Sequence, residues 1–454
     1  MKGNFLLSTE LAQRLYWESA AKLPVIDYHN HLLSEEIVND RRFDNLYDLW
    51  IQPDPYKHRA MRMCGVPENL ITGNSSIEDK FQAWCSIFPK LVGNPLYQWS
   101  LMELRDVMEM NEIPGPSNWK ELWKRSLGYL GRNPITTGTI LKKYNVEYNS
   151  PCTTLTDDLS LYMERKDLAP SLRGDDMVLP TENMISKLEG LTGIRIEGLE
   201  QYKQAIAVRM KEFSKAGCCF SDHPINNGFH YYADDGKNEI RFAKAVSGQL
   251  SEREEKDRLA SELLRFMGSQ YAEHHIVMQL HMGAQRTTST RLRNCAGAAG
   301  GYACIGNSAD VESLTGLLDD LEMQSSGLPR VMVFALNPSD HAMLSSLAGS
   351  YSKDDVAGLV TQGPAWWWCD HNYGIRSLLE NTAAYGLLSN FVGMTTDSRS
   401  FLSFIRHDYF RRILCDWLAN RALAQDLPQS TEILEALVRD MCYENAKKII
   451  EKEW

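Results

Sequence analysis

The sequence predicts a (β/α)8 barrel with a helical insertion after its first strand, and three observations support this fold class. First, short apolar runs alternate along the chain with long helical patterns, as expected when parallel strands are joined by helices. Second, about eight such runs occur, the number that closes this barrel. Third, histidine, aspartate and arginine residues follow several runs directly, at the strand ends where such barrels build active sites.

The N-terminal part of the chain supplies the first helix and the first strand. Ser8 or Thr9 is expected to cap a helix that ends before Pro24. An apolar run then begins the first strand. We assign residues 1–33 and 145–454 to the barrel that carries the active site.

Residues 34–144 are expected to form a mostly helical insertion subdomain between these two parts. Helical periodicity predicts four helices, which prolines separate from one another. The expected helices cover residues 46–51, 80–88, 95–110 and 119–130.

Seven further strand candidates follow the insertion. They lie at residues 146–148, 168–172, 218–220, 276–280, 331–336, 358–362 and 391–394. Each is a short stretch with apolar residues that is followed by a turn or a polar residue. Three of the runs are followed by His281, Asn337 and Asp397.

Composition and charge narrow the class of protein. The chain carries 48 Lys and Arg against 59 Asp and Glu, and its net charge of −11 disfavours nucleic acid and anionic membranes as partners. No apolar run approaches the roughly 20 residues of a membrane span, and the N-terminus lacks the layout of a signal peptide. The ten cysteines are irregularly spaced without a C-x-x-C pair, so we expect reduced thiols, a cytoplasmic protein and no thiolate zinc site. No glycine-rich phosphate motif occurs, so no bound nucleotide is expected.

The motif His29-Asn30-His31 is the first candidate for chemistry. On a strand, residues two apart point to the same face, so both imidazoles could bind one divalent metal ion. Two structural histidines are the alternative interpretation of the motif alone. Asp397 and His281 follow other predicted strands, and together they favour the metal-ligand interpretation. Asp397 also suits a helix cap or a turn.

Two arginines are candidates for binding an anionic substrate. Arg399 stands two residues after Asp397, where its guanidinium could hold a carboxylate through two hydrogen bonds. Arg173 ends a predicted strand and offers a second contact. The alternatives are a surface ion pair for Arg399 and a salt bridge from Arg173 to Asp175.

Further histidines and tryptophans extend the candidate site. His223 and His281 are each candidates for additional metal ligands or acid/base groups, although lone histidines are often structural. Trp366 begins a triplet with Trp367 and Trp368. This triplet could stack on a sugar or exclude water, and core packing is the alternative.

Several longer stretches, spread nearly from end to end, resemble one enzyme family. They cover residues 27–32, 43–50, 56–62, 93–97, 221–223, 281–284 and 391–414, of which the last is the most specific. On these stretches the chain resembles the uronate isomerase (glucuronate isomerase) family, a branch of the amidohydrolase superfamily. The resemblance implies a distorted (β/α)8 TIM-type barrel and a divalent metal ion, usually zinc. It also implies interconversion of D-glucuronate with D-fructuronate and of D-galacturonate with D-tagaturonate.

The resemblance also implies roles for individual residues. It makes His29, His31 and Asp397 the metal ligands, and it places Tyr56 in the catalytic site as a phenol. Arg173 and Arg399 become contacts of the substrate carboxylate or hydroxyls, alongside the candidates Trp366 and His281.

The chain departs from the family pattern at three places. Pro55 precedes Tyr56 where the family usually has histidine. Gly174 follows Arg173 where the family pattern is Trp-Arg-Pro-Asp. Residues 153–158 replace the usual Thr-Thr-Asp-Asp-Pro.

The expected reaction is isomerisation of an aldose to a ketose by way of an enediol. Asp397, Tyr56 and Arg399 are the expected catalytic residues, and Asp397, metal-bound water or Tyr56 could return the proton to C1. Two alternatives remain open, namely a metal-dependent hydrolase on the same scaffold and a non-catalytic sugar-acid-binding protein, which Pro55 suggests. We also expect a homo-oligomer.

Overall fold

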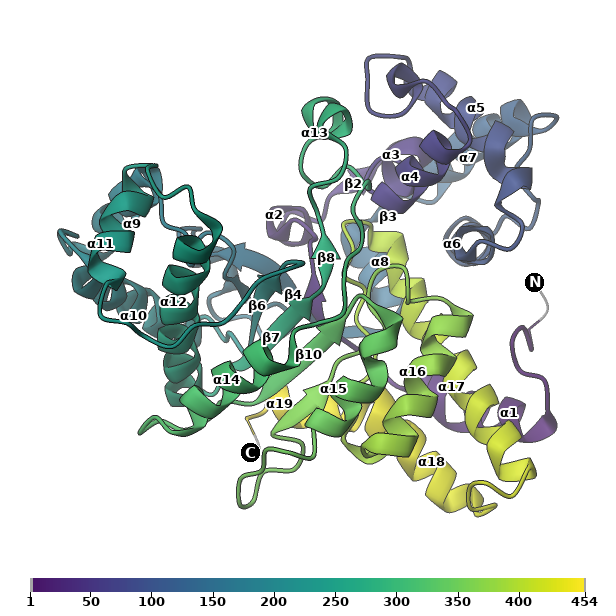
Figure 1. Ribbon diagram of the computed structural model, residues 1–454. Helices are drawn as coiled ribbons and strands as arrows, with labels where there is room; N and C mark the ends of the chain where they lie inside the picture. Colours follow the sequence, from purple (N-terminus) through teal and green to yellow (C-terminus); the bar gives the residue numbers. More distant parts are fainter. Residues whose placement is uncertain (1–2, 453–454) are drawn as a thin grey trace.

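The computed structural model describes residues 3–452 and shows a sheet of parallel strands surrounded by helices (Figure 1). Seven strands pair in the order β1-β4-β5-β6-β7-β10-β11, each parallel to its neighbour. Their bounds are β1 Val25–Asn30, β4 Val146–Thr154, β5 Ser171–Arg173, β6 Phe220–Ile225, β7 Val277–Met282, β10 Val331–Ala335 and β11 Val360–Gln362. Helices separate most consecutive strands, and the predicted fold class is confirmed.

The last expected strand differs from the prediction. Residues 391–394 form no strand, and Gly393 and Asp397 have positive φ angles of 87° and 44°, which interrupt a regular ladder. The segment nevertheless lies against β1. Asp397 N donates to His29 O at 3.0 Å, and His31 N donates to Ser398 O at 2.9 Å. Two backbone hydrogen bonds therefore join the end of the barrel sequence to its first strand.

The observed strands reach further toward their C-terminal ends than the apolar runs predicted. The run at 218–220 only begins β6, which continues through Asp222 and His223, and β7 includes His281. A prediction from apolar runs ends these strands too early, because their C-terminal residues have polar side chains. Residues expected just after the strands consequently lie within them.

The segment expected to be helical between β1 and β4 contains seven α-helices in the described chain. They are α2 Ser34–Val38, α3 Leu46–Trp50, α4 Pro55–Met63, α5 Ile77–Ile87, α6 Pro95–Met108, α7 Trp119–Arg132 and α8 Thr137–Lys143. The four expected helices are present as α3, α5, α6 and α7, which gather beside the sheet in Figure 1. Two short strands, β2 Arg42–Phe43 and β3 Ile135–Thr136, pair antiparallel. The division into barrel and insertion subdomain stays a prediction.

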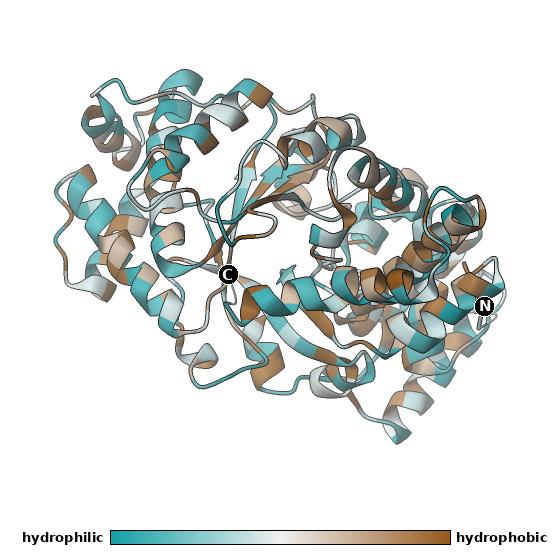
Figure 2. Cartoon of the chain, turned by 90° about the horizontal axis from the view of Figure 1, so that it is seen from below, coloured by the Kyte–Doolittle hydropathy of each residue, from teal (hydrophilic) through white to brown (hydrophobic). Residues whose placement is uncertain are grey.

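The remaining helices flank the sheet. At the N-terminus, Thr9 caps α1 Glu10–Arg14, and two irregular helical turns continue to Lys22. The others are α9 Glu182–Thr192, α10 Leu199–Lys215, α11 Asn238–Val246, α12 Arg253–His274, α13 Thr290–Ala296, α14 Val311–Glu322, α15 His341–Leu347, α16 Asn372–Tyr385, α17 Ile405–Leu423, α18 Thr431–Arg439 and α19 Asn445–Ile450. Figure 2 shows hydrophobic and hydrophilic stretches alternating along many of them, as expected of helices with one buried face. Over residues 3–452, none of these helices has the length and apolarity to cross a membrane.

A buried aspartate positions the first strand against the last segment. Asp27 is fully buried in β1, where its Oδ1 accepts hydrogen bonds from Thr395 Oγ1 at 2.9 Å and Thr396 N at 2.7 Å. His407, at the start of α17, adds a contact of 3.2 Å from its Nε2 to the same oxygen. Burial raises the pKa of Asp27, but His407 and Thr396 outweigh it and hold the pKa below its usual value. An ionised carboxylate thus fixes the register between β1 and residues 395–396.

Candidate active site

His29 of β1 and His31, one residue past the end of that strand, meet one aspartate from the closing segment. His29 Nε2 lies 3.1 Å and His31 Nε2 lies 3.0 Å from the same oxygen of Asp397, Oδ1. The other oxygen, Oδ2, accepts a hydrogen bond from Trp366 Nε1. All three histidine and aspartate side chains are buried or nearly so, with 2%, 17% and 6% of their surfaces exposed. The structure therefore brings together the three residues that the sequence selected as metal ligands.

The surroundings of this cluster favour a negative charge on Asp397 and a positive charge on His31. Burial opposes ionisation of Asp397, but hydrogen bonds from His29 and His31 hold its pKa well below the usual value. Burial lowers the pKa of His31, but Cys152 and Asp397 outweigh it and raise that pKa to about 9. A bound cation would replace the imidazole protons, since a metal ligand must be a neutral imidazole.

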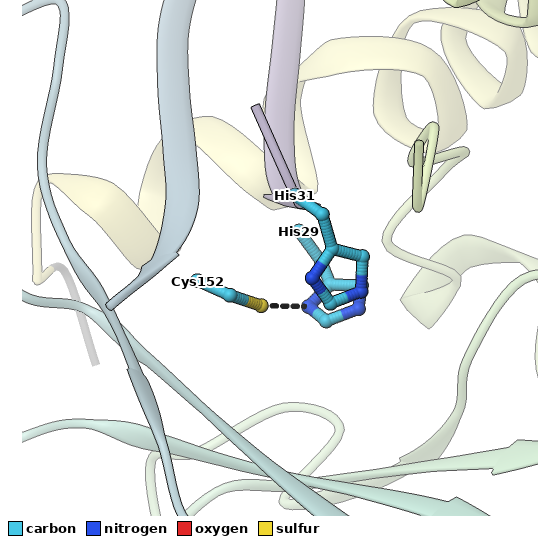
Figure 3. Close-up of side chains that lie close together, drawn as sticks. All are labelled: His29, His31 and Cys152. Atoms are coloured by element: carbon cyan, nitrogen blue, oxygen red, sulfur yellow. Dashed lines mark hydrogen bonds between the residues drawn. The ribbon is translucent and has the colours of Figure 1, made fainter. Parts of the chain in front are cut away.

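Cys152 joins the cluster, although the sequence selected no thiol. Its Sγ lies 3.6 Å from His29 Nδ1 and 3.6 Å from Asp222 Oδ2. Figure 3 shows the thiol pointing from β4 toward the two imidazoles. Donor atoms of His29, His31 and Cys152 all lie within 4.8 Å of one another. Cysteine spacing excluded a thiolate site because it reports only ligands close in sequence, whereas Cys152 comes from the neighbouring strand.

A second group of possible ligands approaches His29 from β6 and β7. Asp222 Oδ1 in β6 lies 2.7 Å from His281 Nδ1 in β7, and donor atoms of His29, Asp222 and His281 lie within 4.8 Å of one another. The His281 ring stacks on Phe334 with 4.2 Å between centroids. Its Nε2 is buried without a hydrogen-bond partner among residues 3–452. Asp222 was missed as a candidate, although it adjoins His223 at a predicted strand end.

His223, a candidate for an additional metal ligand or an acid/base group, is not brought to this cluster, and that candidate role stays a prediction. Adjacent strand residues point to opposite faces, and Asp222 takes the inner one. His223 Nε2 lies 2.7 Å from the hydroxyl of Tyr271 in α12. Burial lowers the pKa of His223 to about 4, so the ring is neutral at pH 7 and serves packing.

The two candidate arginines lie beside the metal-type cluster. Arg173 Nη1 is 3.2 Å from His31 Nδ1, and its Nε donates to Asp175 Oδ2 at 2.6 Å. Arg173 therefore forms the expected salt bridge to Asp175 and also contacts His31. Arg399 forms no ion pair with a carboxylate within residues 3–452, and burial followed by repulsion from Arg173 lowers its pKa. Two neighbouring guanidiniums make this end of the site suitable for an anion.

Tyr56 enters from the insertion, one residue into α4, after Pro55 at its first position. Its hydroxyl donates to Asp370 Oδ2 at 3.1 Å, and its ring packs edge-on against Trp368 at 5.1 Å. Burial, with Asp370 next, raises the pKa of Tyr56 well above its usual value, so the phenol keeps its proton. The carbonyl of Pro55 closely approaches Gly301, at a position that a Cβ atom there would fill.

The tryptophan triplet encloses this site. Trp366 is buried, packs against His281 at 4.7 Å and donates to Asp397. Trp367 contacts the Trp366 ring and the guanidinium of Arg286. Trp366 is therefore the tryptophan of the triplet that reaches the cluster, and its stacking on a sugar stays a prediction.

The chemistry of the donor set fits a divalent metal ion. Imidazole nitrogens, carboxylate oxygens and a thiol are the ligand types of zinc and neighbouring transition metals. The unpartnered Nε2 of His281 shows that the buried polar groups here are not satisfied by protein alone. The cluster could hold one ion near His29, with arginines and a phenol placed to bind and protonate an oxygen-rich anion.

Sequence comparison gives one consistent family. A model of the family described as glucuronate isomerase matches residues 1–450. A uronate isomerase of Clostridium perfringens is 36% identical, with 100% of this chain and 99% of the relative covered. A uronate isomerase of Histophilus somni is also 36% identical, with 99% and 98% covered.

Solved structures agree in fold. The uronate isomerase of Thermotoga maritima superposes with a TM-score of 0.91 at 26% identity, covering 99% of both chains. The glucuronate isomerase of Caulobacter crescentus has the same fold, with a TM-score of 0.91 at 21% identity, covering 100% of this chain and 97% of that one. The similarity therefore extends over the full barrel and the helices inserted after β1.

Proposed function

The chain belongs to the glucuronate isomerase family, and from that premise we propose that it interconverts D-glucuronate with D-fructuronate and D-galacturonate with D-tagaturonate. The enzyme is thus an intramolecular oxidoreductase acting on aldoses and ketoses. The observation that carries the proposal is that His29 and His31 both contact Asp397, beside two arginines. The chain is also similar to a uronate isomerase over its full length.

The proposed cofactor is one divalent metal ion, with zinc as the preferred ion. His29, His31 and Asp397 are the proposed ligands, and their shared contact at Asp397 Oδ1 supports this assignment. When bound, the ion supplies a Lewis acid that polarises a substrate oxygen. Cys152 and the Asp222–His281 pair border the same histidine and complete its surroundings.

The proposed substrate contacts follow from the charges of the site. Arg173 and Arg399 bind the carboxylate or hydroxyls of the hexuronate, because their positive charges lie close enough to repel each other and an anion between them would relieve that repulsion. Trp366 and His281 line the space next to Asp397. A negatively charged sugar acid therefore suits this site better than a neutral sugar.

The proposed chemistry moves one proton from carbon to carbon. Removal of the C2 proton gives an enediol, and return of a proton to C1 gives the ketose, while a hydroxyl proton passes from the oxygen at C2 to the oxygen at C1. Asp397 is the proposed group for the carbon-bound proton, since hydrogen bonds keep it ionised. Tyr56 is the proposed phenol for the hydroxyl proton.

A direct assay tests the proposal. Purified protein is incubated with D-glucuronate and D-galacturonate, and ketose formation is measured beside a panel of lactones and amides. Ketose formation from either uronate with no hydrolysis of the panel is expected. Hydrolysis without isomerisation would instead support a metal-dependent hydrolase, which the same donor set could serve.

We also propose a homo-oligomer that acts in the cytoplasm. Val92 and Tyr373 are 75% and 77% exposed and line a groove of 730 Å³ between α6 and α16, which suits a contact between subunits. All ten cysteines are free, as expected in a reducing compartment. Light scattering of the purified protein measures the oligomeric state directly.

A further inference from the structure

A single buried carboxylate holds the hydroxyl of Tyr56. The hydroxyl donates to Asp370 Oδ2 at 3.1 Å, across 314 positions of sequence. Asp370 follows the tryptophan triplet in the segment between β11 and α16 and is only 4% exposed. Neither the family resemblance nor the sequence pattern selected this residue.

Arg406 donates to the same oxygen of this carboxylate. Its Nη1 donates to Asp370 Oδ2 at 3.2 Å and to Thr396 O at 2.9 Å. The guanidinium also lies 4.8 Å from the ring centre of Tyr56 and 4.6 Å from that of Trp99. Because Thr396 immediately precedes Asp397, Arg406 ties the Tyr56–Asp370 pair to the segment that carries the proposed metal ligand.

This arrangement determines the direction in which Tyr56 can exchange protons. The phenol hydrogen points to Asp370, so the lone pairs of the phenol oxygen are free to accept a hydrogen bond. Three side chains near Asp370 lower its pKa: Arg406 from α17, Tyr56 from α4 and His371, the next residue in the chain. Burial raises the pKa of Asp370 above the usual value, although Arg406 opposes it, so this carboxylate accepts a proton more readily than an exposed one.

We propose that Asp370 is a positioning residue for the isomerisation, orienting the Tyr56 hydroxyl and receiving its proton while Tyr56 takes the hydroxyl proton at C2. The substrate O–H bond breaks as a new bond forms to the Tyr56 oxygen, and the original phenol O–H bond breaks as one forms to Asp370. The reverse transfer delivers a proton to the oxygen at C1. Overall, Tyr56 and Asp370 neither gain nor lose a proton or an electron. The inference rests on the proposed role of Tyr56.

A double-mutant cycle on the full-length enzyme with D-glucuronate tests the inference. Tyr56→Phe is expected to lower kcat about a hundredfold through loss of proton transfer. Asp370→Asn is expected to lower it about tenfold through loss of one charge-assisted hydrogen bond. Because Asp370 acts through Tyr56, the double variant is expected to have the kcat of Tyr56→Phe alone.

Asp416→Asn is the matched control. This buried carboxylate accepts from Ser8 Oγ at 2.6 Å and from Arg376 Nη2 at 2.6 Å, so it has a hydroxyl and an arginine as partners, as Asp370 does, but different ones. Its kcat is expected to equal that of the wild type. Asp370→Ser replaces the asparagine variant in the cycle if that variant does not fold, and Asp370→Glu, which keeps the charge opposite Arg406, is expected to retain more of the kcat than either.

Two results would overturn the role of Asp370 while leaving that of Tyr56 intact. One is wild-type kcat in Asp370→Asn, and the other is a double variant whose loss is the product of the two single losses, about a thousandfold. Wild-type kcat in Tyr56→Phe would instead remove the phenol from the proposed reaction and overturn the inference with it.

Discussion

His29 Nε2 lies 3.1 Å from Asp397 Oδ1, although 368 positions of sequence separate the two residues. The backbone of Asp397 also donates to the carbonyl of His29 at 3.0 Å. The contact between side chains is thus supported by a contact between main chains at the point where the barrel closes. This geometry makes the carboxylate the first target for testing the site.

Replacing Asp397 with asparagine should lower kcat on D-glucuronate about a thousandfold, because the amide neither carries the negative charge nor exchanges a proton as a carboxylate does. Steady-state ketose formation measures the effect. Asp310→Asn is the control, since Asp310 makes a comparable contact of 2.8 Å with His230 at the surface. Near wild-type rates in Asp397→Asn would remove this residue from the mechanism.

Metal content and uronate turnover should fall together on chelation. Roughly one divalent ion per chain is expected before treatment, since the proposed ligands form one mononuclear cluster. Readdition of zinc should restore both quantities, and His31→Gln should lower the bound metal of untreated protein. Elemental analysis beside activity measures both. Metal-free protein with full activity would contradict the proposed site.

Replacing Arg399 with methionine should raise the KM for D-glucuronate about tenfold or more, because one charge-assisted contact to the substrate carboxylate is lost. The effect should be much smaller for any neutral aldose that the enzyme accepts. Arg195→Met provides a control at an arginine that is 85% exposed and pairs with Glu197. Equal KM values for Arg399→Met and wild type would show that the substrate anion lies elsewhere.

His223 should contribute stability that is lost on acidification. Its pKa is lowered by burial to about 4, whereas the unfolded chain has the usual value of about 6.5. The unfolded chain therefore takes up the proton first, so the contribution is complete above pH 6.5 and falls as the pH approaches 4. Over this window the advantage of the wild type over His223→Gln in free energy of unfolding should shrink by about 3 kcal/mol.

Urea unfolding at several pH values measures this difference. His230→Gln is the control, because the His230 side chain is 47% exposed. A difference between wild type and His223→Gln that stays constant from pH 6.5 to 4 would show that His223 is not held neutral by burial.

Solvent deuterium should appear at C1 of the ketose or at C2 of recovered aldose when the reaction runs in deuterated water. An enediol pathway passes the carbon-bound proton through a protein group, from which it exchanges with solvent. Nuclear magnetic resonance of the products detects the label. Products without label at either carbon would favour hydride transfer over the enediol.

Much of the fold and part of the site could be predicted from local sequence patterns. Apolar runs alternating with helical stretches located most strands, because burial on both faces leaves a continuous apolar signature. The spacing of His29 and His31 predicted a shared face, because the side-chain period of a strand is two residues. Asp397 was selected because it follows an apolar run near the end of the barrel sequence.

The tertiary structure alone decided which other side chains meet these three. Asp222 and His223 are neighbours in sequence and point to opposite faces of β6, and only the packing of the chain decides that Asp222 meets His281 and His223 meets α12. Cys152 and Asp370 reach the site across strands and loops, and no local periodicity encodes such contacts. Local patterns in the sequence thus determined the helices, the strands and the shared face of His29 and His31. The residues that surround these histidines were determined by the tertiary structure, because distances between strands depend on packing of the whole chain.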